Sequence, residues 1–174
     1  SNVQFPNSLQ SIGNNSFHGC RAINELEFPA KLSSIGSGAF RNCPGLSELT
    51  IPDAMTTISD NAFRDCSGLV EVRLGKSVTS IGAYSFSGCR KLKLLSIPET
   101  VTTLGAGAFA SCESLEEVTL PSGLSHAISA SPTDDKGATL SQFHDCSSIN
   151  KVTIRIPKVS KVFTEWIDND ELKT

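Results

Sequence analysis

The sequence predicts a single elongated solenoid, because its residues recur at a fixed step of 23 along most of the chain. The step is visible in five evenly spaced cysteines, Cys20, Cys43, Cys66, Cys89 and Cys112. Five phenylalanines keep the same step: Phe17, Phe40, Phe63, Phe86 and Phe109. A period of about 20 to 29 residues with recurring Leu and Ile is typical of a leucine-rich-repeat solenoid. Because each turn of such a solenoid packs only on its neighbours, we expect one right-handed array and not several domains.

Each copy of the repeat is expected to begin with one short strand. Two apolar rows, two residues apart, lie on one face of that strand. They are Val3, Leu26, Leu49, Val72, Leu95 and Val118, and then Phe5, Phe28, Ile51, Leu74, Ile97 and Leu120. Proline follows in all but one copy, and it ends a strand because it has no N–H for the ladder. We therefore expect short parallel strands of successive turns to form one sheet on the concave face.

The other half of each turn carries a row of Ile or Leu at positions 12, 35, 58, 81 and 104. Glycine follows in four of these five copies, as Gly13, Gly36, Gly82 and Gly105, with Ser59 in the fifth. The recurring glycine predicts a bend with positive φ. We expect the segment from Phe to Cys to form a single helical or 3-10 turn on the convex face.

The period is interrupted once, between His126 and Leu140. Phe143, Cys146 and Ile149 resume the pattern 34 residues after their counterparts, which places an 11-residue insertion at 128–138. Insertions into a solenoid become loops on one face, often the binding face. A plain surface loop is the alternative. We expect the solenoid to occupy residues 1–157, in about six to seven turns.

Residues 158–174 are expected to form a capping helix and tail. Val159, Val162, Phe163, Trp166 and Ile167 are spaced like one face of an amphipathic helix. Such a helix would cover the last open core face of the solenoid, and a helix that binds a partner is the alternative. Because the chain opens inside a predicted strand without a comparable cap or a targeting signal, we expect it to be a fragment of a longer protein.

Composition and motifs argue against several classes of function. The net charge of -3 disfavours nucleic acid as a partner, and no apolar run is long enough to cross a bilayer. The regular spacing of the six cysteines favours a row of free, buried thiols over a metal site, with disulfides between neighbouring turns as the alternative. Catalytic and phosphate-binding motifs are absent, so we expect no enzyme, no cofactor and no metal. The oligomeric state is left open.

The exposed side of the predicted strands carries the candidate binding residues. They are Glu25, Glu27, Glu48, Thr50, Glu71, Arg73, Leu94 and Glu117. Most of these side chains are acidic, which predicts a surface for a basic protein partner with Leu94 as an apolar contact. A solvated face that only keeps the sheet soluble is the alternative.

The repeat can be written L-x-x-[LIV]-x-[IL]-P-x-x-[VL]-x-x-I-G-x-x-A-F-x-x-C, as in Leu46 to Cys66 and Leu92 to Cys112. This pattern resembles the BspA-like, or treponemal-type, leucine-rich repeat, over about residues 3–156. The resemblance implies an extracellular or cell-surface protein that adheres to host matrix or cell-surface proteins, without catalytic residues. We therefore expect a non-catalytic protein-binding module. The alternative is a structural spacer with no ligand site in this chain.

Overall fold

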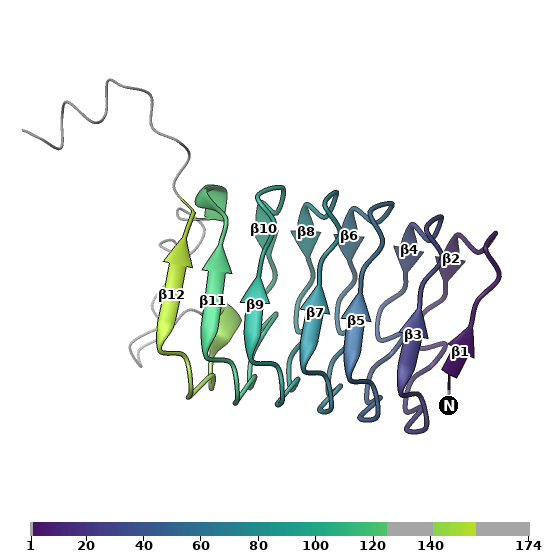
Figure 1. Ribbon diagram of the computed structural model, residues 1–174, viewed down its shortest axis with the longest axis horizontal. Helices are drawn as coiled ribbons and strands as arrows, with labels where there is room; N and C mark the ends of the chain where they lie inside the picture. The colour runs from purple at the N-terminus through teal and green to yellow at the C-terminus, as the bar shows by residue number, and fades with distance from the viewer. Residues whose placement is uncertain (1, 125–140, 156–174) are drawn as a thin grey trace, which may run out of the picture.

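The computed structural model describes residues 2–124 and 141–155, which form a solenoid of stacked turns with two rows of short strands (Figure 1). The odd-numbered strands and β12 form the first row. They are β1 (Asn2–Gln4), β3 (Glu25–Glu27), β5 (Glu48–Thr50), β7 (Glu71–Arg73), β9 (Leu94–Ser96), β11 (Glu117–Leu120) and β12 (Lys151–Ile154). This row is the predicted one, and we call its exposed side the concave face.

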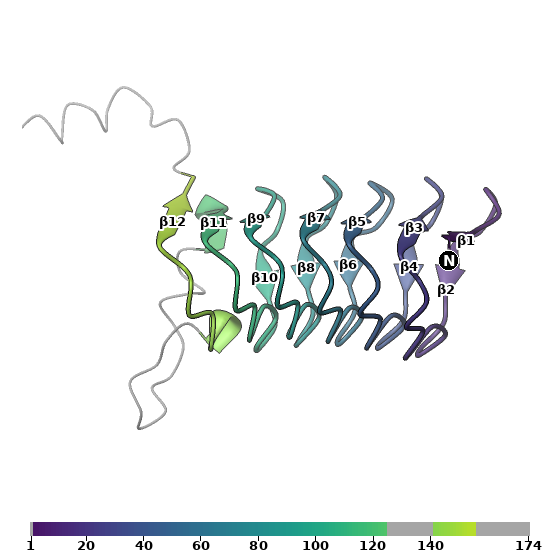
Figure 2. The ribbon, with the colours of Figure 1, turned by 60° about the horizontal axis from the view of Figure 1, so that its bottom comes forward.

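A second row of two-residue strands lies behind the first, as Figure 2 shows. It consists of β2 (Ser11–Ile12), β4 (Ser34–Ile35), β6 (Thr57–Ile58), β8 (Ser80–Ile81) and β10 (Thr103–Leu104). Sequence reasoning missed this row and predicted only a bend there. Five consecutive turns of the described chain carry both strands.

The strands of the first row pair in parallel, one repeat apart. Val3 lies opposite Leu26, and Leu49 lies opposite Val72. Strand β12 pairs with β11 so that Val152 lies opposite Val118, which confirms the 34-residue step across the interruption. The hydrogen-bonded ladders form three blocks, β1-β3, β5-β7 and β9-β11-β12, and not the single continuous sheet that was expected. Strands of three residues share few ladder bonds, so a small twist between turns is enough to separate the blocks.

The glycine row has a different cause from the one predicted. Positive φ occurs elsewhere in the turn, as at Asn61 and Asp65, and not at the glycines that follow the Ile row. A Cβ on Gly82 would lie 2.7 Å from the backbone nitrogen of Asp60 in the preceding turn. Glycine is therefore needed because the stacked backbones approach closely. Ser59 departs from this row, and its hydroxyl donates a hydrogen bond of 2.6 Å to the carbonyl oxygen of Ile35.

The segment from Phe to Cys forms irregular turns and not the predicted helical turn, and the 3-10 helix η2 (Ser141–Phe143) ends where the last such segment begins. A second 3-10 helix, η1 (Ser122–Leu124), follows β11. Some backbone hydrogen bonds stay within one turn, as from the N–H of Cys66 to the carbonyl of Phe63 at 3.3 Å. Others run between turns, as from the N–H of Phe40 to the carbonyl of Ala62 and from the N–H of Phe63 to the carbonyl of Ser85, both 2.8 Å. These N–H groups are not available for bonds within a helix, which explains the difference.

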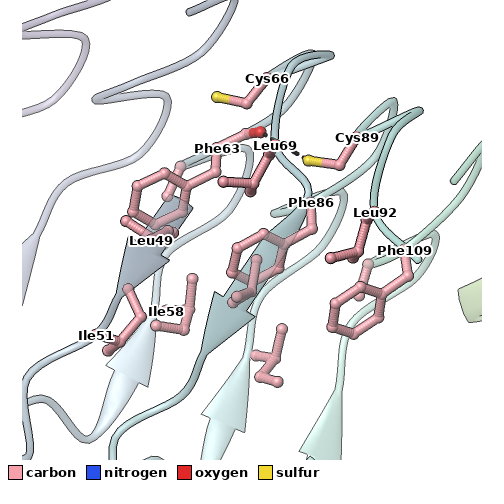
Figure 3. Close-up of a cluster of buried hydrophobic side chains, with 14 of the residues drawn as sticks. Leu49, Ile51, Ile58, Phe63, Cys66, Leu69, Phe86, Cys89, Leu92 and Phe109 are labelled. Atoms are coloured by element: carbon pink, nitrogen blue, oxygen red, sulfur yellow. Dashed lines mark hydrogen bonds between the residues drawn. The ribbon is translucent and has the colours of Figure 1, made fainter. Parts of the chain in front are cut away.

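The core is a column of stacked side chains that runs through the turns (Figure 3). The rings of Phe40, Phe63, Phe86 and Phe109 are fully buried and nearly parallel, with successive centroids 5.6, 5.4 and 5.3 Å apart. All six cysteines are free, four of them buried, which confirms the predicted row of thiols. Burial raises the pKa of the Cys66 thiol to about 12.

The predicted insertion at 128–138 and the predicted cap at 158–174 lie outside the described residues. At the end of the second described range, Val152 and Ile154 of β12 are 50% and 48% exposed. Their partners in β11, Val118 and Leu120, are buried. Within the described ranges, no helix is long and apolar enough to span a membrane.

Candidate binding face

The concave face is built by strict alternation along three-residue strands. In β3, β5, β7 and β9 the middle residue is buried and its two neighbours are exposed. Leu49, for example, is 2% exposed and packs inward, so Glu48 and Thr50 project outward. The structure therefore places all eight predicted residues on one exposed face.

Register brings the predicted residues into rows across the strands. Glu48 lies opposite Glu71, and Leu94 lies opposite Glu117. Lys151 lies on the other side of Glu117, in β12. The row that was predicted to be acidic thus ends beside a lysine.

Two of the predicted glutamates are paired with cations. Arg73 Nε lies 2.8 Å from Glu71 Oε1, and Lys151 Nζ lies 2.9 Å from Glu117 Oε2. In the part of the chain that the structure describes, Glu25, Glu27 and Glu48 make no ion pair. Because exposed pairs of this kind contribute only about 0–1 kcal/mol to stability, their main effect is on local charge. The negative charge is concentrated over β3 and β5 and not spread along the strip.

Each predicted residue lines one of two hollows, and Glu27 and Thr50 also border a further one of about 510 Å³. The larger, about 800 Å³, lies over β7, β9 and β11, and Glu71, Arg73, Leu94 and Glu117 line it. The smaller, about 300 Å³, lies over β3 and β5, and its lining includes Glu25, Glu27, Glu48 and Thr50. The first hollow exposes an apolar side chain, whereas the second is bordered by unpaired carboxylates.

Arg155 is a residue of this face that sequence reasoning missed. Its Nη1 donates a hydrogen bond of 2.8 Å to the carbonyl oxygen of Ile97, and its Nη2 donates one of 2.7 Å to Ser96 Oγ. Glu99 Oε1 lies 3.6 Å from Nη1. Arg155 follows β12 and reaches back to the chain around β9, beside the larger hollow. The available clue was its position, since it stands one 34-residue step after Pro121, where most turns have proline.

Val70 and Lys93 also line the larger hollow and were not predicted. They precede β7 and β9 by one residue, outside the two rows that the period-2 pattern assigns to the face. Val70 is 44% exposed and Leu94 is 60% exposed. The larger hollow therefore combines two exposed apolar side chains with charges of both signs.

Over the described ranges, no three His, Cys, Asp or Glu side chains are grouped as a metal site. His144 Nδ1 lies 3.1 Å from Asp145 Oδ2, both exposed and next to each other in the chain. The concave face itself presents carboxylates, guanidinium groups, an ammonium group and aliphatic carbon, which are groups for non-covalent recognition.

A model of the BspA-type leucine-rich repeat region matches residues 1–116 and 71–173, with six copies. The chain belongs to this family. No curated protein matches the chain. The BspA-type fold is also found in solved structures. A leucine-rich-repeat protein from T. pallidum is 23% identical with a TM-score of 0.74, and the match covers 97% of this chain and 84% of that one.

Two further leucine-rich-repeat structures are longer than this chain. A leucine-rich-repeat protein from Bacteroides ovatus is 24% identical with a TM-score of 0.60, and the match covers 87% of this chain and 42% of that one. A leucine rich cell surface protein from Faecalibacterium prausnitzii is 22% identical with a TM-score of 0.50, covering 93% and 54%. At these identities the likeness supports the fold alone.

Proposed function

We propose that this chain is a non-catalytic module that binds a protein partner through its concave face. The observation that carries the proposal is the larger hollow, in which Leu94 is 60% exposed on β9, a strand that pairs with β11. Exposed apolar side chains in a hollow bordered by polar groups are characteristic of binding sites. Repeat solenoids commonly use an extended concave surface in this way.

The rigid strand floor favours recognition without rearrangement. The buried rows beneath it, such as Leu49, Leu95 and Val118, are 2% exposed, and a packed core holds the residues above them in place. A surface that is already ordered loses less conformational entropy when it binds. The face is therefore suited to hold an extended segment of a partner across several strands.

The charge over β3 and β5 indicates the chemistry of one part of the partner. Glu25, Glu27 and Glu48 are exposed and unpaired among the described residues, and they border one hollow. Complementary charge speeds association and fixes orientation more than it adds affinity. We propose that a basic part of the partner lies over these three glutamates.

We further propose a cell-surface or secreted location and a role in adhesion, with host matrix or cell-surface proteins as partners. The support is the family, together with the F. prausnitzii relative, which is named as a cell surface protein. A spacer with no ligand site is the competing function, and it makes the opposite prediction about changes on the concave face.

The test is a binding screen of this chain against purified matrix and cell-surface proteins by biolayer interferometry. The variant Glu25→Lys, Glu27→Lys, Glu48→Lys is run beside the wild type at low and high salt. The control is Glu113→Lys. Glu113 lines neither of the two hollows, and its Oε1 lies 3.5 Å from Arg90 Nε. We expect to find a partner whose binding is weakened by high salt. The triple variant should no longer bind this partner, whereas the control variant should still bind it. Indifference of every bound protein to the triple variant, and to changes at Leu94, would contradict the proposal.

A further inference from the structure

Leu94 stands where every other described turn except the first, which has Asn2, carries a charged residue. Its counterparts in the row are Glu25, Glu48, Glu71, Glu117 and Lys151. Leu94 and the neighbouring Val70 are the two strongly exposed aliphatic side chains of the larger hollow, at 60% and 44%. Aliphatic carbon placed between charged neighbours gains free energy when another apolar side chain covers it. The hollow therefore has an apolar contact point at its centre.

The charge of the larger hollow is balanced and not acidic. Glu71, Glu116 and Glu117 line it together with Arg73, Lys93 and Arg155. Glu71 and Glu117 already have cations within 3 Å, namely Arg73 and Lys151. A basic ligand group over β9 would compete with these cations. A carboxylate would instead find donors that the hollow leaves partly unused.

Arg155 is the donor best prepared for a carboxylate. Glu99 Oε1 already lies 3.6 Å from Arg155 Nη1, so a ligand carboxylate would share the guanidinium group with Glu99. A guanidinium group carries five N–H donors in a fixed plane, and the bonds to Ile97 and Ser96 use two of them. The same bonds, with the backbone bond of 2.9 Å from Arg155 N to the carbonyl of Leu120, hold the side chain over β9 and β11. A guanidinium that is already held in place loses little freedom when it binds an anion.

We propose that the hollow over β7, β9 and β11 binds an extended protein segment in which an apolar side chain packs on Leu94 and Val70 and a nearby Asp or Glu carboxylate accepts hydrogen bonds from Arg155. The inference rests on the proposed function, because it names the chemistry of a segment bound to the same face. Ser96, which Arg155 contacts, lies two residues from Leu94, or about 7 Å along a strand. At about 3.3 Å per residue, at most two residues of an extended ligand span a separation of this size, so we expect the acidic residue one or two positions from the apolar one.

The direction of the bound segment follows from the two hollows. Its basic part lies over Glu25, Glu27 and Glu48, and its acidic and apolar part lies over β9. A segment placed the other way would set its acidic group against Glu25, Glu27 and Glu48 and its basic group beside Arg155. The face is therefore selective for the order of charges as well as for their sign.

The experiment selects binders from a displayed library of random octapeptides. The baits are the wild type, Leu94→Glu, Arg155→Met and the control Lys91→Glu, an exposed charge outside both hollows. Leu94→Glu puts into β9 the residue that β7 and β11 already carry, so folding is expected to survive, and circular dichroism checks this for each bait. We expect the wild type and the control to enrich peptides with an apolar residue one or two positions from Asp or Glu. Leu94→Glu should lose them.

One enriched peptide is then synthesised with Asp and with Asn at the acidic position, and its affinity is measured by fluorescence anisotropy. The loss of a charge-assisted hydrogen bond predicts about tenfold weaker binding of the Asn peptide to the wild type. The affinities of Arg155→Met for the two peptides should differ by less than about twofold, because this variant lacks the guanidinium group that would donate hydrogen bonds to the Asp carboxylate. Leu94→Glu should weaken both by about tenfold or more.

Several outcomes would overturn the inference while the proposed function stands. These are enrichment of basic peptides without an acid, equal affinity of the wild type for the Asp and Asn peptides, and insensitivity to Leu94→Glu. If the screen finds a protein partner but the selection enriches no octapeptide, the inference is likewise overturned and the proposed function stands. Failure of both the screen and the selection would reject the inference and the proposed function together.

Discussion

The Sγ atom of Cys66 lies 3.1 Å from the carbonyl oxygen of Phe40, in the preceding turn. The same bond recurs one turn later, where the thiol of Cys89 donates to Phe63 at 3.5 Å (Figure 3). The cysteine row thus satisfies buried carbonyl groups beside the phenylalanine column. The regular spacing of cysteine reflects stacking, because each turn needs a small side chain that is both apolar and a weak donor.

Cys66→Ala is expected to lower the free energy of unfolding by about 1–3 kcal/mol, because it removes the donor and leaves the Phe40 carbonyl unsatisfied. Urea unfolding followed by circular dichroism measures the change. Cys20→Ala is the matched control at the half-buried end of the row and should cost less than about 0.5 kcal/mol. Equal losses in the two variants would show that the buried bond is unimportant.

The raised pKa of Cys66 predicts that stability falls in alkaline solution. Burial raises the pKa of this thiol from 9.0 to about 12, so the folded state keeps a proton that the unfolded state releases between these values. The protonated thiol makes its full contribution to the free energy of unfolding below pH 9 and loses it as the pH rises toward 12. Over this range the free energy of unfolding falls by up to about 1.4 kcal/mol per pH unit. Urea midpoints from pH 8 to pH 11, for the wild type and Cys66→Ala, give the slope due to this thiol. Parallel curves would contradict the prediction.

Phe63→Ala should be among the most damaging single changes, because the ring is fully buried between Phe40 and Phe86. Truncation of such a ring leaves a cavity and costs about 3–5 kcal/mol. Denaturant unfolding measures the loss. A value below about 1 kcal/mol would mean that this row does not form the core.

The glycine row offers a test of backbone stacking. Gly82→Ala places a methyl group against the Asp60 backbone and should cost about 1–3 kcal/mol. Gly123→Ala is the control, because a Cβ there meets no atom of the described residues within 4 Å and φ is not positive. It should change stability by less than about 0.5 kcal/mol. Similar effects of the two substitutions in thermal melts would argue against close approach as the reason for the row.

The repeat period made the core predictable. Rows such as Phe40 to Phe109 follow directly from spacing, and so does the exposure of Glu48 and Leu94, because strands alternate. The second strand row was missed because two residues, such as Thr57 and Ile58, are too short to show a period. The spacing predicted positive φ at Gly82. The reason for glycine there is the close approach of the Asp60 backbone in the preceding turn, which the local sequence does not reveal.

The face was predicted as a set of positions but not as a distribution of charge. Which glutamates are neutralised depends on cations from other strands, such as Lys151 beside Glu117. Arg155 reaches Ser96 across a separation of 59 residues. Such pairs arise from stacking and from side-chain conformation, and neither is visible in a period. Sequence reasoning therefore located the face and missed how charge and hollows are distributed along it.

Hydrogen–deuterium exchange of the chain with and without its tightest partner from the screen tests recognition by the concave face most directly. Amide exchange reports on the backbone of each segment, and β3, β5, β7, β9 and β11 resolve into separate peptides by mass spectrometry. We expect added protection around these strands, strongest at β9, and little change between Phe63 and Cys66 or between Phe86 and Cys89. Protection confined to the Phe-to-Cys turns, with none at β7 and β9, would contradict the account.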